Sequence, residues 1–405
     1  MSCPESEEQQ SISTRKWMWR VRAAIVELLA VRAAFWLHGS EDYGRASSWV
    51  FAIGLLFGWV LQRSRFCFFC MLRDLFEDRN SRTALAMLAA LAVGIVGHIV
   101  LFTAWIPNPL AGHLPPRAHI GPLSWVIALG GFVFGVGMSF SGSCISAHLY
   151  RLGEGSKLSP VALLGAVGGA ALGLWSWNTF YLRFLIDARP VWIPAWRGFA
   201  MATGLPLLVM VGLAAWLLRY LPVGAAAART ERLRMRDVLR SVFVERWAPW
   251  VGAMMVGLIS TAALFRGAPL GVTAEMNRIG RILGDALAML PQRLEGLDAM
   301  RGCRIAADAS LLTPNALFVI ALVIGGMIGS FGSGTVSPST PKLKAYPLAL
   351  LGGVLLGWGS FIALGCSIGT LLSGIHAGSL GAWVFAVAMV VGIRVSLPVR
   401  QWAER

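Results

Sequence analysis

One stretch of sequence organises the rest of the chain: Phe140-Ser-Gly-Ser-Cys144-Ile-Ser-Ala-His-Leu-Tyr-Arg-Leu-Gly-Glu-Gly155. A similar stretch lies near the C-terminal end of the sequence: Leu364-Gly-Cys366-Ser-Ile-Gly-Thr-Leu-Leu-Ser-Gly-Ile-His-Ala-Gly378. In both stretches a cysteine follows a long apolar segment, and a Gly-Ser pair comes about three helical turns later. A membrane pathway with a constriction lined by sulfur accounts for this repetition better than a soluble core does.

The composition indicates a membrane protein. Apolar residues make up 56% of the chain and charged residues only 14%, whereas about a quarter of a soluble domain is charged. The mean hydropathy is +0.66. Five segments contain no Asp, Glu, Lys or Arg and exceed the roughly 18 residues that a transmembrane helix needs: 83–116, 118–150, 158–182, 198–218 and 345–393. We therefore predict an all-α polytopic membrane protein embedded in a lipid bilayer.

The formal net charge of +15 does not indicate a nucleic-acid partner. Arg and Lys gather at the ends of the apolar segments and in residues 219–246, where Arg outnumbers Asp and Glu. Cytoplasmic loops of membrane proteins collect positive residues in this way. We expect no nucleic-acid partner, and a cytoplasmic location for the basic segment.

The order of the motifs predicts two pseudo-symmetric halves. Duplicated halves with interrupted helices at matching places are typical of transporters, and here they predict about 8–9 transmembrane helices plus short re-entrant helices. Before the first half, residues 1–14 are expected to be a disordered tail and residues 15–37 an amphipathic helix in the headgroup region. The expected parts are an N-terminal tail and amphipathic helix (1–48), a first membrane repeat (49–218), a basic cytoplasmic linker (219–247), a second membrane repeat (248–399) and a C-terminal tail (400–405).

A third cysteine follows the first apolar segment. This segment, residues 49–61, is short for a helix that crosses the whole membrane. The sequence continues Gln62-Arg-Ser-Arg-Phe-Cys67-Phe-Phe-Cys70. Arginines are costly at membrane depth, so a short re-entrant helix buried in protein is expected here. Arg65 could attract anions at an entrance or anchor that helix at the interface. Cys67 and Cys70 have zinc-like spacing, but no second such pair exists, so packing is the better interpretation of Cys70 and no metal is expected.

A glycine and a cysteine between two helices form a knee suited to an anion. Glycine at 142 or 365 lets the backbone turn and lets a solute approach it closely. The next helix then begins with free N–H groups and a favourable dipole. A thiol adds a weak donor with a soft, polarisable surface, which suits a sulfur-containing anion. The competing interpretation is that each buried cysteine is simply a small apolar residue.

No motif indicates an enzyme or a bound cofactor. The sequence lacks a nucleotide-binding loop, a zincin helix and a nucleophile elbow. His98 falls within an apolar segment, where a hydrogen-bonded position between helices is expected. Cys3 and Cys303 stand in polar sequence and are expected to be incidental.

Three stretches together resemble the YeeE/YedE family of bacterial inner-membrane sulfur transporters. They are Leu61-Gln-Arg-Ser-Arg-Phe-Cys67-Phe with Leu72-Arg-Asp74, Gly142-Ser-Cys144 with Leu149-Tyr-Arg-Leu-Gly-Glu-Gly155, and Leu364-Gly-Cys366 with Gly369 and Ser373-Gly-Ile375. The likeness extends over residues 49–399. It departs from the family at Ser143, where glycine is usual, and at Ala147 and His148, which replace a glycine-containing pair.

The resemblance implies uptake of thiosulfate through an hourglass-shaped helical protein in the bacterial inner membrane. It implies transient S–H contacts of the anion with three cysteines, which are Cys67, Cys144 and Cys366 here. It also implies a small cytoplasmic sulfur-carrier protein as a partner. The predicted pathway therefore consists of these cysteines with Gly142, Gly365 and Arg65.

Two other functions stay open at this stage. In one, a membrane sulfurtransferase-like component carries persulfide sulfur on a cysteine to a cytoplasmic carrier, which requires an accessible thiolate. In the other, the chain is a permease for a selenium compound or for a soft metal held by thiols.

Overall fold

The computed structural model describes residues 4–116, 118–221, 241, 244–267, 270–291, 293–297, 312–336 and 341–404 of the chain, without the side chains of residues 4–17 and 404. The first half contains α1 (Pro4–Gly39), α2 (Gly44–Ser64), α3 (Phe68–Glu77), α4 (Arg82–Trp105), α5 (Trp125–Ser141), α6 (Ile145–Gly153), α7 (Leu158–Phe180) and α8 (Pro194–Leu217). The second half contains α10 (Pro249–Phe265), α11 (Thr273–Ala286), α12 (Pro314–Ser333), α13 (Ala345–Ile362), the π-helix η4 (Ser367–Ile375) and α14 (Leu380–Glu404).

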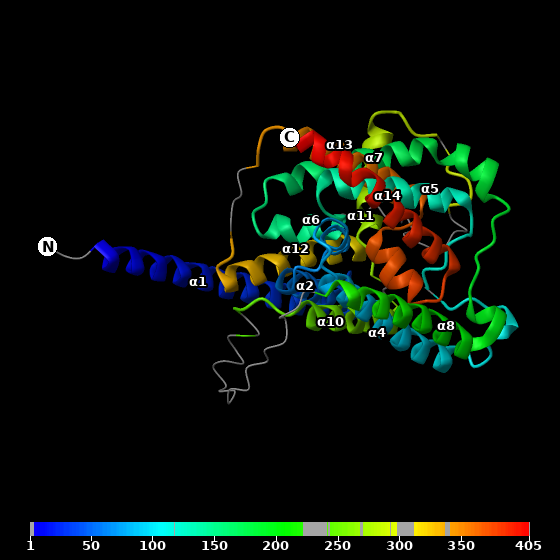
Figure 1. Cartoon of the computed structure of the whole chain (residues 1–405), viewed down its shortest axis with the longest axis horizontal. Coiled ribbons are helices and arrows are strands. Elements are labelled where there is room, and N and C mark those ends of the chain that lie inside the picture. Colours follow the sequence, from blue (N-terminus) through cyan, green and yellow to red (C-terminus); the bar gives the residue numbers. More distant parts are fainter. Residues whose placement is uncertain are drawn as a thin grey trace.

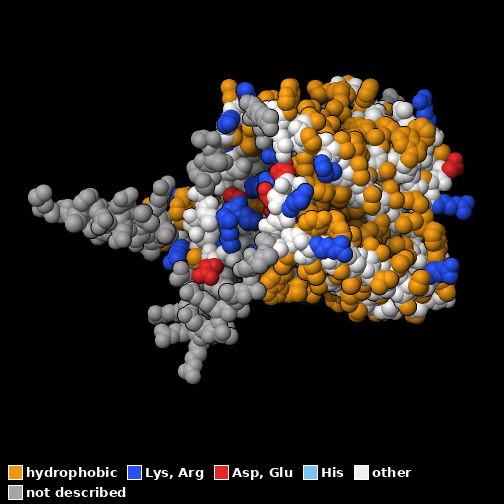
Figure 2. Space-filling model, in the orientation of Figure 1, with side chains coloured by type: hydrophobic (Ala, Val, Ile, Leu, Met, Phe, Trp, Pro, Cys, Tyr) orange, Lys and Arg blue, Asp and Glu red, His pale blue; other side chains and the backbone are white. Residues whose placement is uncertain are grey.

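The helices form a bundle whose surface is largely apolar. Within the described residues, eight helical stretches are long and apolar enough to cross a membrane, and α10 is a shorter apolar helix. Figure 2 shows hydrophobic side chains over most of the bundle, with Lys and Arg gathered at the end from which α1 projects. The prediction of an all-α polytopic membrane protein is confirmed.

Helices of the first half pack against helices of the second half in matching pairs. Helix α2 packs on α12 while α10 packs on α4, and α7 packs on α13 while α5 packs on α14 (Figure 1). Small residues allow these helices to approach closely. A side chain at Gly58 would strike the Leu322 carbonyl, and one at Gly169 would strike the Val354 carbonyl. Two halves with the same internal order of helices would produce such matching pairs.

The N-terminal helix differs from the expectation. Helix α1 already begins at Pro4, where a disordered tail was expected, and it does not lie across the bundle as an interfacial helix would. Trp19 contacts Phe331 near the end of α12, and Leu37 shares a hydrophobic cluster with Leu317 near its start. Helix α1 therefore runs antiparallel beside α12 and projects beyond it (Figure 1). The buried Ala23 permits this close contact.

Two other boundaries were also wrong. Helix α2 begins at Gly44, before the predicted apolar segment, so it has 21 residues and the length of a full crossing. Helix α14 continues through Pro398 to Glu404, so residues 400–404 belong to the last helix and not to a separate tail. Proline is tolerated inside membrane helices because neighbouring groups satisfy the freed carbonyl.

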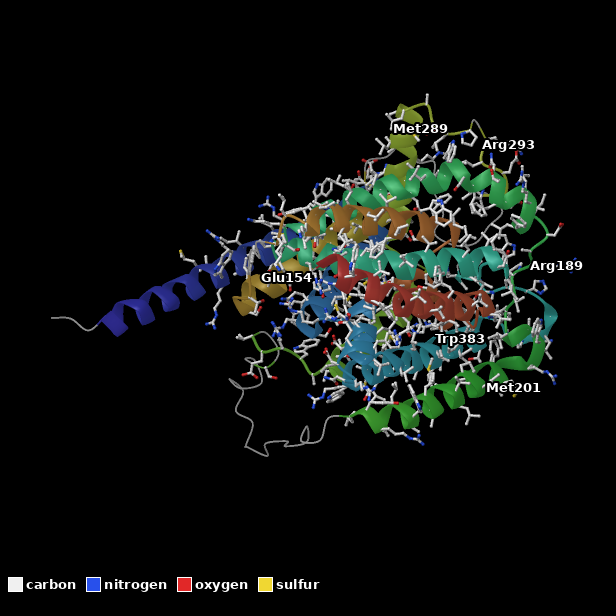
Figure 3. All side chains as sticks on the ribbon, turned by 45° about the horizontal axis from the view of Figure 1, so that its top comes forward. Glu154, Arg189, Met201, Met289, Arg293 and Trp383 are labelled. Atoms are coloured by element: carbon white, nitrogen blue, oxygen red, sulfur yellow. The ribbon has the colours of Figure 1, made fainter. Side chains whose placement is uncertain are left out.

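The basic linker leaves and re-enters the bundle at one end. The N–H of Ser81, just before α4, donates to the Tyr220 carbonyl at 3.4 Å, and the N–H of Trp247 donates to the Arg63 carbonyl at 3.2 Å. Most of the linker, residues 222–240 and 242–243, lies outside the described residues. We call this the linker end of the bundle. Glu154 lies there, and Arg189 lies at the opposite end (Figure 3).

Candidate functional site

Three cysteines occupy the same place in three helix breaks. Cys67 precedes α3, Cys144 precedes α6 and Cys366 precedes η4, and each is the N-cap residue of the helix that follows. All three have extended backbone conformations and are buried. Each thiol therefore stands at a helix N-terminus, where backbone N–H groups and the helix dipole favour negative charge.

Two residues before each cysteine, the backbone turns through the left-handed region. The turning residues are Arg65 with φ 53°, Gly142 with φ 81° and Leu364 with φ 58°. A side chain at such a position costs about 1–2 kcal/mol, so only the Gly142 knee is built without strain. All three cysteine motifs therefore share one backbone geometry, although only the second has glycine at the turning position.

The backbone turn expected at Gly365 lies one residue earlier. Its φ is not positive, and the adjacent Leu364 makes the turn. A side chain at Gly365 would instead strike the Thr370 hydroxyl and come within 3.0 Å of the His119 ring. Glycine is needed there for close packing against His119.

The first two knees bring their thiols together. The sulfur atoms of Cys67 and Cys144 are 3.9 Å apart, and both residues are completely buried. The Cys144 sulfur is also 3.2 Å from the Ser146 hydroxyl. A soft donor surface made of two thiols and a hydroxyl thus lies inside the bundle, where α3 and α6 begin.

The third cysteine belongs to a separate knee. The Cys366 sulfur accepts a hydrogen bond from the Gly369 N–H at 3.5 Å, which caps η4. After η4 the chain reaches Ser379, which forms an isolated bridge with Trp192. Of the three predicted cysteines, the structure joins two and keeps the third on its own short helix. Cys3 and Cys303 lie outside the described residues.

Arg65 is engaged in an ion pair. Its Nη1 lies 3.0 Å from Glu154 Oε2, and Gln62 Nε2 donates to Glu154 Oε1 at 3.1 Å. The Glu154 side chain is only 10% exposed. These contacts tie the end of α2 to the end of α6, which favours the anchoring role of Arg65 over anion attraction.

A second arginine, which the sequence analysis did not single out, lies beside Cys70. Arg151 Nη2 donates to Cys70 Sγ at 3.3 Å, and its Nη1 donates to the Ser143 hydroxyl. Arg151 follows Cys144 by two helical turns, so both project from one face of α6. That spacing is a signal that could have identified it. Cys70, interpreted from sequence as packing, is half-buried and receives this charge-assisted bond.

The second half has its own buried ion pair. Arg278 has its Nη2 2.6 Å from Glu275 Oε1, and Thr313 donates to Glu275 Oε2 at 3.0 Å. The Glu275 carboxylate raises the pKa of Arg278 above its usual value. This pair holds the start of α11 against the start of α12.

Two histidines meet beside η4. The ring centroids of His98 and His376 are 5.0 Å apart. His98 Nδ1 is 3.0 Å from the Gly94 carbonyl one turn back in α4, and the ring contact with His376 puts this hydrogen-bonded histidine between helices, as expected. His376 Nδ1 is 3.2 Å from the Ser260 hydroxyl of α10. Both rings are buried and fill the contact between α4, α10 and η4.

The sequence as a whole matches one family. The profile of the sulphur transport family aligns with residues 63–395, which include all three cysteine knees. The chain belongs to the sulphur transport family. The chain is a multi-pass membrane transporter, and its breaks before α3, α6 and η4 fall inside the matched region.

Two curated relatives match this chain over most of its length, and a third matches a shorter part of it. The thiosulfate transporter TsuA of Escherichia coli is 27% identical over 350 residues, covering 84% of this chain and 90% of that protein. The thiosulfate transporter TsuA of Spirochaeta thermophila is 25% identical over 348 residues, covering 84% and 94%. The probable transporter YedE of Escherichia coli is 26% identical over 152 residues, covering 37% of each chain.

Proposed function

We propose that the protein is a permease for thiosulfate or a related small sulfur-containing anion. The observation that carries this proposal is the buried pair of thiols from Cys67 and Cys144, 3.9 Å apart, in a membrane protein of the sulphur transport family. The two relatives named thiosulfate transporters support this choice of substrate.

In this proposal the anion passes Cys67, Cys144 and Cys366 in a narrow path. Each S–H group donates a weak hydrogen bond to the anion, and the soft thiol surface favours its terminal sulfur. The N-termini of α3, α6 and η4 supply a favourable field without a fixed positive charge. Weak contacts suit transport because a permeating anion must leave each contact as readily as it enters.

Uptake of radiolabelled thiosulfate by cells that express the intact chain tests the proposal. We expect Cys67→Ala, Cys144→Ala and Cys366→Ala each to lower uptake roughly ten- to hundredfold, since a hydrogen bond to a charged group contributes about 1.5–3 kcal/mol. Cys303→Ala, which removes a cysteine outside the three motifs, is the matched control. Normal uptake by two of the three single variants, at equal protein abundance, contradicts the cysteine path.

The same proposal includes the organisation of the chain. The reciprocal packing of α2 with α12 and of α10 with α4 supports residues 49–218 and 248–399 as repeats. The basic residues 219–247 support a cytoplasmic linker end by the positive-inside tendency, and the membrane of this proposal is the bacterial inner membrane. A small cytoplasmic sulfur carrier would then receive the anion at the linker end. Proteolysis of the linker in inside-out vesicles checks this orientation.

A persulfide-carrying function has one observation in its favour, because Cys70 is half-buried and bonded to the Arg151 guanidinium. Neighbouring positive charge stabilises a thiolate. Mass spectrometry of the protein after exposure to thiosulfate separates this function from transport. A sulfur adduct on Cys70 favours it, and unmodified cysteines during active uptake exclude it.

A further inference from the structure

A polar cavity of about 520 Å³ opens at the linker end, beyond the thiol pair. Its walls come from α3, α6, the end of α5, the starts of α7 and α13, and the end of α14. Cys70 and Ser141 line it, together with His148 and Ser159. A water molecule occupies about 30 Å³ in the liquid, so the cavity has room for a small anion with part of its hydration shell. We call it the basic vestibule.

The vestibule is strongly positive. Its lining includes five cationic residues, and none of the described lining residues is acidic: Arg73, Arg151, Lys342, Lys344 and Arg400. Arg73 is compensated by Asp74, whose carboxylate is 2.8 Å away. Lys342 and Lys344 are exposed at the mouth, and Figure 2 shows Lys and Arg gathered at this end. A concave surface of one sign raises the local concentration of counter-ions.

The inner wall offers donors of fixed geometry. Arg151 is held by its bonds to Cys70 Sγ and to the Ser143 hydroxyl. His148 is 3% exposed, its Nδ1 is 3.4 Å from the Ser159 hydroxyl, and its Nε2 has no hydrogen-bond partner. A buried polar atom without a partner is uncommon in proteins and indicates a missing ligand or water.

We propose that the basic vestibule is a binding site for divalent tetrahedral sulfur oxyanions, and that Arg151 is its principal ligand. The oxygen atoms would accept hydrogen bonds from Arg151, while Lys342 and Lys344 attract the anion at the mouth. The role of this site in transport rests on the proposed function. The transport path would then have a charged site for the oxygen atoms of the anion next to the polarisable thiols. The oxygen-bearing end of thiosulfate matches the vestibule, and its terminal sulfur matches Cys70 and the thiol pair.

Binding of inorganic sulfate to the purified full chain tests this site without requiring transport. We expect saturable binding of radiolabelled sulfate in low-salt buffer, weakened by added sodium chloride because the charges at the mouth are screened. The double variant Lys342→Gln/Lys344→Gln should lower the affinity about tenfold, and Arg151→Gln should lower it more. Because both lysines are exposed, the double variant remains a valid test if Arg151→Gln does not fold.

The matched control is Arg266→Gln, which removes one positive charge far from the vestibule, where the guanidinium lies 5.5 Å over the Trp49 ring. It should bind sulfate with unchanged affinity. Absence of sulfate binding by the intact chain overturns the proposal. Unchanged affinity in the double lysine variant, or an equal loss in Arg266→Gln, overturns it as well.

A further variant separates this site from the cysteine path. Cys366→Ala lies in another knee and should bind sulfate normally while it loses thiosulfate uptake. If Cys366→Ala and one of the other two cysteine variants retain uptake, the cysteine path fails but the sulfate result stands. If instead the lysine variant binds sulfate normally while Cys366→Ala loses uptake, the vestibule fails and the cysteine path stands.

Discussion

The sulfur atoms of Cys67 and Cys144 lie 3.9 Å apart, although 77 residues separate them in the sequence. The two knees meet because α3 and α6 both begin at this place in the bundle. Two buried thiols at this distance can react with each other, which neither cysteine can do alone.

We expect mild oxidation to join these two thiols. A disulfide has an S–S length of about 2.05 Å, so the two sulfur atoms have to approach each other from 3.9 Å. Copper–phenanthroline with oxygen would remove two electrons and two protons and should abolish uptake, and a reductant should restore it. Peptide mass spectrometry should find the Cys67–Cys144 link, and Cys67→Ala should resist inactivation. Loss of uptake without any Cys67–Cys144 link contradicts this prediction.

We expect Gly142→Ala to destabilise the protein by about 1–2 kcal/mol, because a side chain at positive φ is strained. The space itself is open, since a Cβ there would come no closer than 3.7 Å to Arg400. Gly168→Ala is the matched control, as Gly168 is in α7 with nothing within 4 Å of the added carbon. It should stabilise the protein by up to about 1 kcal/mol. Thermal unfolding in detergent measures both, and equal shifts of one sign would refute the conformational argument.

Removing Arg65 should destabilise the protein more than neutralising Glu154, its partner in the ion pair. Arg65→Ala leaves a carboxylate that is 10% exposed without its cation, whereas Glu154→Gln leaves an arginine that is 36% exposed and can be hydrated. We therefore expect the arginine variant to lose more stability, about 3 kcal/mol against about 1 kcal/mol. A double-mutant cycle gives the coupling energy. A larger loss in Glu154→Gln would contradict this assignment of burial.

His119 should make stability depend on pH. Burial lowers the pKa of His119 to about 4, from an ordinary value near 6.5. The folded protein then binds fewer protons than the unfolded chain between pH 4 and 6.5, so its stability falls as the pH is lowered through this window. The full effect is on the order of 3 kcal/mol.

His119→Gln tests this dependence. The variant should unfold at a midpoint that changes less between pH 7 and pH 4.5 than the midpoint of the intact chain. His113→Gln is the matched control, because His113 is exposed in the same connection between α4 and α5. If the slopes of the His119 variant and the intact chain agree, another group controls the pH dependence.

Much of the architecture could be predicted because a membrane imposes simple rules. The uncharged segments predicted to span the membrane at residues 83–116 and 158–182 begin within one residue of α4 and α7 and contain nearly all of both helices. Long uncharged runs can satisfy their backbone in a bilayer only as helices, so composition determines both class and location. The cysteines at the helix breaks were visible for the same reason, since each follows such a run.

The identity of the turning residues could not be predicted in the same way. Glycine is the expected residue at positive φ, and it marks the turn at Gly142 but not at the other two knees. Arg65 and Leu364 adopt this strained conformation because tertiary contacts hold them there, including the ion pair of Arg65 with Glu154.

The sequence alone determined that this protein is a helical membrane transporter of the sulphur transport family with three cysteines at helix breaks. Only the tertiary structure decided that two of those thiols face each other, that Arg65 is neutralised by Glu154, and that Arg151 stands beside Cys70. The physical reason is the range of each effect. Hydrophobicity and helix breaks act along the chain and can be read locally, whereas contacts across 77 or more residues depend on how separate helices pack.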